Sequence, residues 1–253
     1  MGESKIMTPM IRQDNSLFFS GKKYFQKGQY LKKSTIESVF EFAYQMTFGA
    51  TGEHRNHRSG GTHVRKQGEI FADTFQGKLA EFAIYNHLYK SFNINVPDLD
   101  VWKLGQWDSC DLIADDLKIS VKSTKSFGQL LLLEAKDWNE EGEYIPNMQS
   151  GNSQYDIFIL VRMNPFCDNI LKRMSAYYVN SYNKEELKQA IMNELWEYDI
   201  PGFITLYELQ EVIHNKQIIR KGEKINGTMP MDADNYYCQA IDMHPLSELI
   251  DYK

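Results

Sequence analysis

The sequence lacks several features that would assign it to a specialised class of protein. It contains only three cysteines, Cys110, Cys167 and Cys238, which are odd in number and far apart. Such a set favours a reducing compartment and argues against a disulfide framework or a cysteine-based zinc site. No run of eighteen apolar residues is present, so no transmembrane helix is expected. Residues 1–15 are polar and lack the apolar segment of a signal peptide, which predicts a cytoplasmic protein.

The sequence also has fewer basic than acidic residues. The chain has 28 lysines and arginines against 34 aspartates and glutamates, which gives a formal net charge of −6. An acidic protein does not by itself favour binding to nucleic acid, so a DNA-binding cleft would have to be locally basic. The composition, 42% hydrophobic and 25% charged, is typical of a globular protein that buries a core. Because the 253 residues contain no internal repeat and no low-complexity linker, they predict a single domain.

Residues 110–122 predict a β-hairpin. Two runs of alternating apolar residues, 110–114 and 117–122, flank a short turn at Asp115 and Asp116. Side chains alternate between the two faces of a strand, so one face of the hairpin would be apolar and would point into a core. The residues on that face are Cys110, Leu112, Leu117, Ile119 and Val121.

The register of this hairpin decides which polar side chains meet on its other face. If Ala114 pairs with Leu117, then Asp111 lies opposite Ser120, and Lys122 follows two residues later on the same side. A slip of one residue would separate these groups. The predicted register places a carboxylate beside a hydroxyl and diagonally near an ammonium.

An acid at the start of one strand, followed by acid-x-Lys on the next, is the active-site pattern of the PD-(D/E)XK nucleases. This chain resembles that superfamily, particularly the type II restriction endonucleases, over residues 70–165. Asp111 matches the first acid, and Lys122 matches the lysine. Two positions depart from the pattern: Cys110 replaces the proline, and Ser120 replaces the second acid. The resemblance implies that Asp111 and Lys122 are catalytic, with Ser120 supporting the site.

Phosphodiester hydrolysis explains why these residue types would be needed. The resemblance implies Mg²⁺ as the cofactor, and Mg²⁺ takes oxygen ligands, usually one or two carboxylates together with several waters. The ion lowers the pKa of a bound water and stabilises the charge that develops on the phosphate. A lysine beside the ion can orient or deprotonate that water. Since Ser120 is not an acid, a second carboxylate must come from elsewhere in the chain.

Two glutamates are candidates for this second metal ligand. Glu81 lies beside the apolar stripe of a predicted helix, residues 73–88, which precedes the hairpin. Glu134 follows an apolar run, twelve residues after Lys122, where a substituting acid occurs in family members that carry serine. We favour Glu81 over Glu134. Asp98, which follows a literal proline, is a weaker alternative to Asp111 because it falls in a loop ahead of the hairpin.

Basic residues near the predicted site are candidates for DNA contact. The glycine-rich loop at 49–70 has little periodicity, and its arginines suit binding to phosphate or to guanine, although a plain surface loop is the alternative. Its histidines have no cysteine or acid at ligand spacing, which argues against a zinc site. The predicted contacts are Arg55, Arg58, Arg65 and Lys66 in this loop, Thr124 and Lys125 after the catalytic strand, and Arg220 in a basic stretch.

The order of helix, hairpin and further buried strands predicts an α/β fold with a mixed central β-sheet flanked by helices. The resemblance makes this a restriction-endonuclease-like core over about residues 34–180, with a C-terminal α+β elaboration at 181–253 that could recognise DNA. Residues 1–20 are expected to form a loose arm. Residues 130–133 form a buried segment whose periodicity does not decide between a strand and a helix. Further patterns predict helices at 34–49, 184–198 and 205–214, and strands at 156–162, 176–179 and 236–241.

The sequence therefore predicts a Mg²⁺-dependent type II restriction endonuclease that cuts double-stranded DNA at a short specific site. By the same resemblance we expect a homodimer, because a two-fold protein reads a palindrome, and a cognate DNA methyltransferase in the same system. One alternative is a repair or junction-resolving nuclease of the same superfamily. Others are a DNA-binding module without catalysis, and an unrelated α/β protein in which Asp111 and Lys122 form a surface ion pair.

Overall fold

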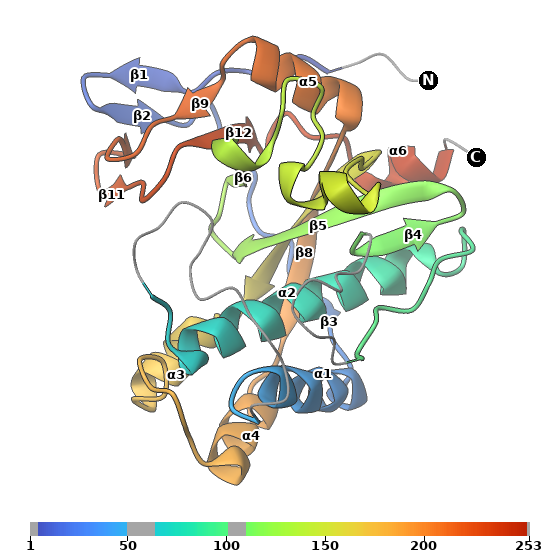
Figure 1. Cartoon of the computed structure of the whole chain (residues 1–253), viewed down its shortest axis with the longest axis vertical. Helices are drawn as coiled ribbons and strands as arrows, with labels where there is room; N and C mark the ends of the chain where they lie inside the picture. The colour runs from blue at the N-terminus through green and yellow to red at the C-terminus, as the bar shows by residue number, and fades with distance from the viewer. Residues whose placement is uncertain (1–4, 50–63, 101–109, 252–253) are drawn as a thin grey trace.

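A five-stranded mixed sheet lies at the centre of the fold (Figure 1). The computed structural model describes residues 5–49, 64–100 and 110–251. Strands β5 and β7 run parallel, and every other neighbouring pair in the sheet is antiparallel. The strands, in spatial order, are β3 (Gln29–Tyr30), β8 (Glu197–Thr205), β7 (Ile157–Asn164), β5 (Leu117–Lys125) and β4 (Leu112–Ala114).

Four helices cover one face of this sheet, the lower side in Figure 1. The largest core cluster lies between them and the strands, and the long helix contributes Phe71, Phe75 and Leu79 to it. These residues recur every three or four positions, which puts them on one side of a helix. The helices are α1 (Lys33–Met46), α2 (Gln67–Leu88), α3 (Cys167–Arg173) and α4 (Lys184–Met192).

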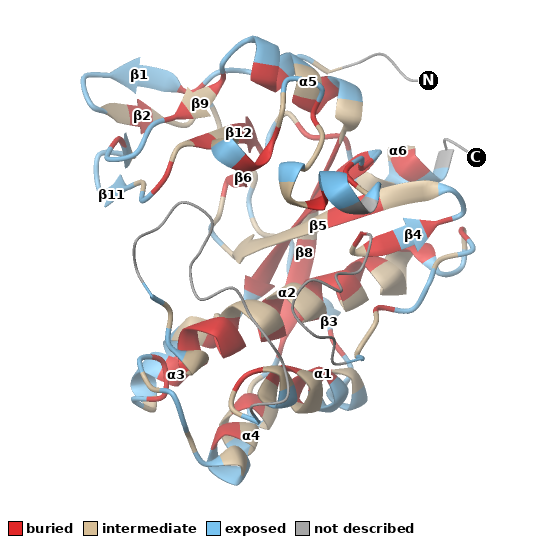
Figure 2. Cartoon of the chain, in the orientation of Figure 1, coloured by how far each residue is buried: buried red, intermediate tan, exposed pale blue. Residues whose placement is uncertain are grey.

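The opposite face of the sheet is covered by a smaller three-stranded sheet and a helix. Phe158 and Leu160 of β7 pack into this second core, whereas Ile157, Ile159 and Val161 pack toward the helices. Because both faces of β7 are covered, its first five residues are all apolar and the strand is buried along nearly all of its length. The neighbouring strand β8 is buried in the same way (Figure 2). The covering elements are β6 (Leu130–Glu134), β12 (Asn235–Gln239), β9 (Ile218–Ile219), α5 (Leu206–His214) and 3-10 turns at Ala135–Asp137 and Ile145–Ser150.

The N-terminal residues belong to the fold, so the prediction of a loose arm at 1–20 is wrong for residues 7–18. Met7, Met10 and Leu17 are buried against the C-terminal half of the chain. The elements here are β1 (Ile11–Gln13) and β2 (Ser16–Phe18), which share a four-stranded sheet with β10 (Lys224–Ile225) and β11 (Met229–Pro230). A final helix, α6 (Leu246–Asp251), contacts β8.

The predicted α/β class, a mixed sheet flanked by helices, is confirmed, but the sheet extends beyond the predicted core boundary at residue 180. Strand β8 comes from the segment 181–253 and lies between β7 and β3. The predicted helix 184–198 ends at Met192, because Glu197 already pairs with β7 and Leu195 is exposed. The sequence pattern did not predict β8, because Pro201 and Gly202 interrupt its run of strand-forming residues.

The predicted strand at 176–179 is also wrong, because the segment is a turn that packs against the start of α2. The N–H of Gly68 donates to the carbonyl of Val179 at 3.0 Å. A Cβ on Gly68 would lie 2.0 Å from the carbonyl oxygen of Ala176, so only glycine allows this approach. In the part of the chain that the structure describes, no helix is long and apolar enough to cross a membrane.

Arg162, on β7, is fully buried and joins three parts of the chain. Its guanidinium donates to both carboxylate oxygens of Asp199 on β8, at 2.8 and 2.5 Å. It also donates to the carbonyls of Lys23 and Tyr24, at 2.6 and 2.9 Å, and to Gly128 at 3.4 Å. Because all these groups lie at the same end of β7, the arginine ties the N-terminal segment and the β5–β6 turn to the central sheet.

Removing one partner of this pair should destabilise the protein severely. We expect Arg162→Met and Asp199→Ala each to lower the free energy of unfolding by about 3–5 kcal/mol, since each strands the other charge in the core. Urea unfolding of both single variants and the double variant should give a favourable coupling. The exposed pair Arg220–Asp234 is the control, and its variants should lose no more than about 1 kcal/mol. Equal losses at the two pairs would contradict this account.

Candidate active site on the β4–β5 hairpin

The hairpin adopts the predicted register. Ala114 pairs with Leu117 and Leu112 with Ile119, which puts Asp111 opposite Ser120. The Asp111 carboxylate accepts the backbone N–H of Val121 at 2.6 Å. The same oxygen, Oδ2, lies 3.5 Å from the hydroxyl of Ser120. Asp111 is therefore held in place by the strand that carries the candidate lysine.

Asp111 and Ser120 lie on the side of the sheet that faces away from the helices. Ser120 is buried and stands beside Phe158, a member of the second core cluster. Asp111 is half-buried near Tyr155, and burial together with this carboxylate raises the pKa of the Tyr155 phenol. The hairpin is thus covered on this side at Ser120, whereas Ile113 on the same side is exposed.

Cys110 departs from the predicted arrangement. The alternation placed it with Leu112 and Ile119, but it packs in the cluster that contains Phe158 and Leu160. The reason is that β4 begins only at Leu112, so the residues before it do not follow strand alternation. This change leaves the placement of Asp111 unaffected, because its backbone partner on β5 holds it.

Lys122 follows Ser120 on the same face of β5 and lies beside Leu160 of β7. Its side chain is half-buried. Within the described residues, its ammonium has no hydrogen-bond or ion-pair partner. One face of the hairpin therefore carries a positioned carboxylate and, two residues beyond Ser120, a half-buried cation.

The two candidate second acids each contact a lysine. Glu81 is buried on α2, and its carboxylate accepts a hydrogen bond from Lys78 at 2.7 Å. Glu134 ends β6 and pairs with Lys136 at 3.6 Å. Among the residues with described positions, no group of three acidic, histidine or cysteine side chains has a spacing that would hold a metal ion. Asp111, Glu81 and Glu134 therefore do not form a three-ligand cluster in this arrangement.

The weaker alternative, Asp98, has a local role. Its carboxylate accepts the backbone N–H of Asp100 at 2.8 Å, as an acid in a turn commonly does. The segment has no strand or helix at this position. Asp111, not Asp98, is the acid whose carboxylate bonds to β5.

The predicted DNA contacts are spread over several regions. Arg55 and Arg58 lie outside the described residues. Arg65 pairs with Asp73 at 3.0 Å, and Lys66 precedes α2, where its backbone N–H donates to Glu69 at 2.8 Å. Thr124 and Lys125 line a pocket at the end of β5, and Arg220 pairs with Asp234 at 2.8 Å.

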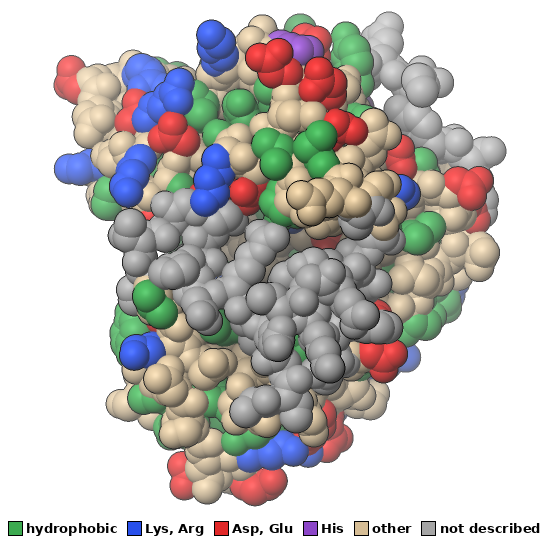
Figure 3. All heavy atoms as spheres, viewed as in Figure 1, with side chains coloured by type: hydrophobic (Ala, Val, Ile, Leu, Met, Phe, Trp, Pro, Cys, Tyr) green, Lys and Arg blue, Asp and Glu red, His purple; other side chains and the backbone are tan. Residues whose placement is uncertain are grey.

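The charged side chains on the viewed surface are unevenly distributed. Figure 3 shows lysines and arginines gathered at the upper left, over β1, β2 and β11, and acidic side chains near α5. Arg220 directly follows β9 in this upper region. Positive charge is therefore gathered locally on this surface, on a protein that is acidic as a whole.

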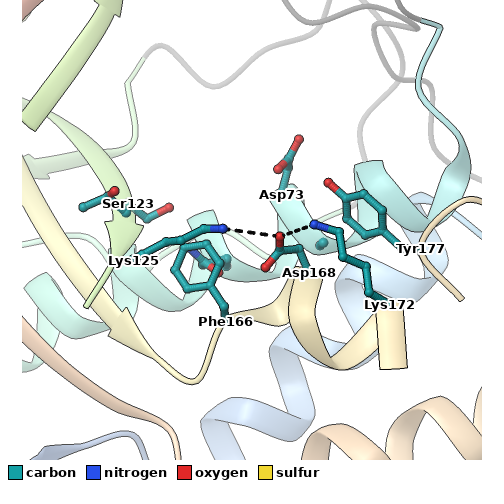
Figure 4. Close-up of a pocket in the computed structure, with 10 residues that line it drawn as sticks. Asp73, Ser123, Lys125, Phe166, Asp168, Lys172 and Tyr177 are labelled. Carbon is teal, nitrogen blue, oxygen red and sulfur yellow. Dashed lines mark hydrogen bonds and ion pairs between the residues drawn. The ribbon is translucent and has the colours of Figure 1, made fainter. Parts of the chain in front are cut away.

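The pocket beside β5 contains charged residues that sequence reasoning did not single out. Figure 4 shows the Asp168 carboxylate between the ammonium groups of Lys125 and Lys172, with Asp73 and Tyr177 nearby. Asp168 and Lys172 are four residues apart on α3, a spacing that predicts a pair on a helix surface. That spacing could not indicate that α3 would bring the pair to the end of β5.

Comparison of the chain with protein-family models, with curated proteins and with solved structures found no match.

The bond from Val121 to Asp111 allows the structural role of this acid to be separated from a catalytic role. Asp111→Asn keeps an acceptor oxygen for the Val121 N–H, so we expect stability within about 0.5 kcal/mol of the parent protein. Asp111→Ala removes the acceptor and should cost about 1–3 kcal/mol, because a part-buried donor loses its partner. Denaturant unfolding measures both values. Equal losses in the two variants would show that the side-chain acceptor does not anchor the hairpin.

Proposed function

We propose that this chain is a Mg²⁺-dependent endodeoxyribonuclease with a restriction-endonuclease-like core, and specifically a type II restriction endonuclease. The observation that supports this most directly is the hairpin, in which Asp111 bonds to the strand that carries Ser120 and Lys122. The acid, the serine and the lysine occupy the positions of the nuclease pattern in register as well as in sequence. The sheet and its covering helices provide a rigid support for such a site.

The chemistry assigns a role to each of the three residues. Oδ2 of Asp111 accepts the Val121 N–H, which leaves Oδ1 as an oxygen ligand for a cation. Mg²⁺ held there would lower the pKa of a bound water and stabilise charge on the phosphate. Lys122 would orient that water as an ammonium or, as the neutral amine, would accept its proton, and Ser120 would keep the Asp111 carboxylate in position.

A second acid would complete the metal site, and Glu81 and Glu134 are the candidates, although Glu81 lies on α2, which covers the opposite side of the sheet from Asp111. The donor chemistry suits Mg²⁺, since all are carboxylates. Each glutamate now contacts a lysine, so binding to the ion would exchange that contact for a metal bond.

The proposed partners follow from the resemblance. The substrate is double-stranded DNA, the active form is a homodimer in the cytoplasm, and a cognate methyltransferase protects the host sites. A nuclease that resolves junctions or repairs damage would use the same hairpin. The serine at position 120, in place of an acid, specifically favours the other alternative, a DNA-binding module without catalysis.

A cleavage assay tests the proposal. We expect the protein to cut unmethylated plasmid and phage DNA into discrete fragments with Mg²⁺ and not with EDTA. Lys122→Ala should lower the rate by about 10²–10⁴-fold, because it removes the group that handles the water. Asp111→Asn should abolish cleavage even though it keeps the hairpin bond. Lys118→Ala, two residues before Ser120 on the same strand, is the matched control and should retain activity.

Each other outcome points to a different function. A smear of products would remove the restriction enzyme and keep a nuclease, and cutting confined to branched DNA would favour a junction-resolving or repair enzyme. DNA binding without cutting, in the parent and in Lys122→Ala alike, would favour the inactive module. Neither binding nor cutting would leave the hairpin as ordinary core structure and the proposal wrong.

The second metal ligand can be identified from the Mg²⁺ dependence of cleavage. We expect either Glu81→Gln or Glu134→Gln to raise the Mg²⁺ concentration for half-maximal rate by roughly tenfold or more. The other variant should stay within about twofold of the parent protein. An unchanged Mg²⁺ dependence in both variants would show that neither glutamate binds the ion.

A further inference from the structure

The segment that leads into β3 is basic along its whole length. Residues 15–36 contain five lysines and no acidic residue. Four of these lysines are exposed, and within the described part of the chain none of the four has a hydrogen-bond or ion-pair partner for its ammonium group. They are Lys22, Lys27, Lys32 and Lys33. The positive charge of this segment is therefore not taken up by ion pairs with the rest of the protein.

Buried side chains of the central sheet hold the backbone of this segment in one conformation. The Asp199 carboxylate accepts the N–H of Gln26 at 2.7 Å. The Glu197 carboxylate accepts the N–H of Gly28, also at 2.7 Å. Both acids are buried beneath the segment, so neither places a carboxylate on its exposed side. A ligand would meet a segment that is already ordered, and its binding would cost little chain entropy.

Two aromatic rings are exposed on adjoining segments at this place. The Tyr24 residue is 78% exposed, and Phe127, in the turn between β5 and β6, is 68% exposed. The side chain of Gln129 joins the two segments, because its amide donates to the carbonyls of Lys23 and Phe127 at 3.1 and 3.3 Å. Arg162 joins them again through the carbonyls of Tyr24 and Gly128. Rings so exposed contribute little to the core, although the backbones that carry them are fixed.

Lysines interleaved with exposed aromatic rings match the chemistry of single-stranded nucleic acid. Ammonium groups bind the phosphates, and a ring stacks on the face of a base whatever the base is. In a duplex the neighbouring base pairs cover these faces, so an exposed ring favours a single strand. A lipid surface would need a larger apolar area, and Leu31, the one aliphatic side chain among residues 20–33, is buried.

We propose that Lys22, Tyr24, Lys27 and Phe127 form a surface, here called the Tyr24 surface, that binds single-stranded nucleic acid without preference for sequence. A base stacks on each of the two rings, and the lysines on either side of Tyr24 contact phosphates. The Tyr24 surface shares no residue with the hairpin that carries Asp111. It therefore goes beyond the proposed function and can be tested without any cleavage.

Fluorescence anisotropy of a short labelled oligo(dT), measured in EDTA over a range of salt concentrations, tests the Tyr24 surface. Tyr24→Ala should weaken binding by about tenfold, because a base loses its stacking partner. Tyr24→Phe keeps the ring and should bind like the parent protein. Lys27→Ala should reduce the slope of log Kd against log salt by about 0.7, the value for one phosphate contact on a single strand. Tyr207→Ala, which removes an exposed tyrosine on α5, is the control.

An abasic strand of the same length separates stacking from charge, because it keeps the phosphates and lacks the bases. We expect the parent protein and Tyr24→Ala to bind this strand equally, and both more weakly than the parent binds oligo(dT). The Tyr24 side chain is exposed, so the variant should fold, and its thermal unfolding should match that of the parent protein.

Several results would overturn this role of the Tyr24 surface. Equal binding of oligo(dT) by the parent and Tyr24→Ala would do so, as would an equal loss of affinity for the abasic strand. A parent protein that binds anionic lipid vesicles and not oligo(dT) would show a membrane surface instead. If the parent cuts duplex DNA with Mg²⁺ but does not bind oligo(dT), only the Tyr24 surface is overturned. Binding that depends on Tyr24, without any cleavage, would overturn only the nuclease.

Discussion

The ion pair between Arg162 and Asp199 is the contact on which the central sheet depends. It is buried in the interior, where a single charge would be very costly, and the carboxylate together with backbone carbonyls satisfies the guanidinium. The partners come from residues 23–26, from the β5–β6 turn and from β8. The end of the sheet beside β5 is therefore assembled from segments far apart in the chain.

The same sheet explains where chemistry can occur. Its central strands pack against an apolar cluster on each face, and the polar side chains of Asp111, Lys122 and Lys125 are partly exposed near the β4 edge and toward the end of β5. Asp111 lies at the β4 edge, held by the backbone of β5, and Lys125 lies where β5 ends. A carboxylate bonded to β5 and a half-buried lysine of β5 therefore lie on one side of this strand. This is the arrangement on which the proposed cleavage of DNA rests.

Local patterns predicted the elements that carry strong short-range signals. The hairpin register followed from alternation around a two-residue turn, and the helix that begins after Thr205 followed from its capping box with Glu208. The strand β8 was missed because Gly202 interrupts its pattern. A Cβ there would lie 2.2 Å from the carbonyl oxygen of His244, so the glycine serves a close approach that no local pattern records.

The sequence by itself determined the α/β class, the hairpin and the pairing of Asp111 with Ser120, because these depend on contacts between residues close together in the chain. Only the tertiary structure decided that β8 joins the central sheet, that Ser120 is buried beside Phe158, and that Lys172 meets Lys125 at a shared carboxylate. The physical reason is that alternation and capping act over a few residues. The charge balance of a pocket depends on which distant helices pack against a strand, and that is set by burial of the whole core.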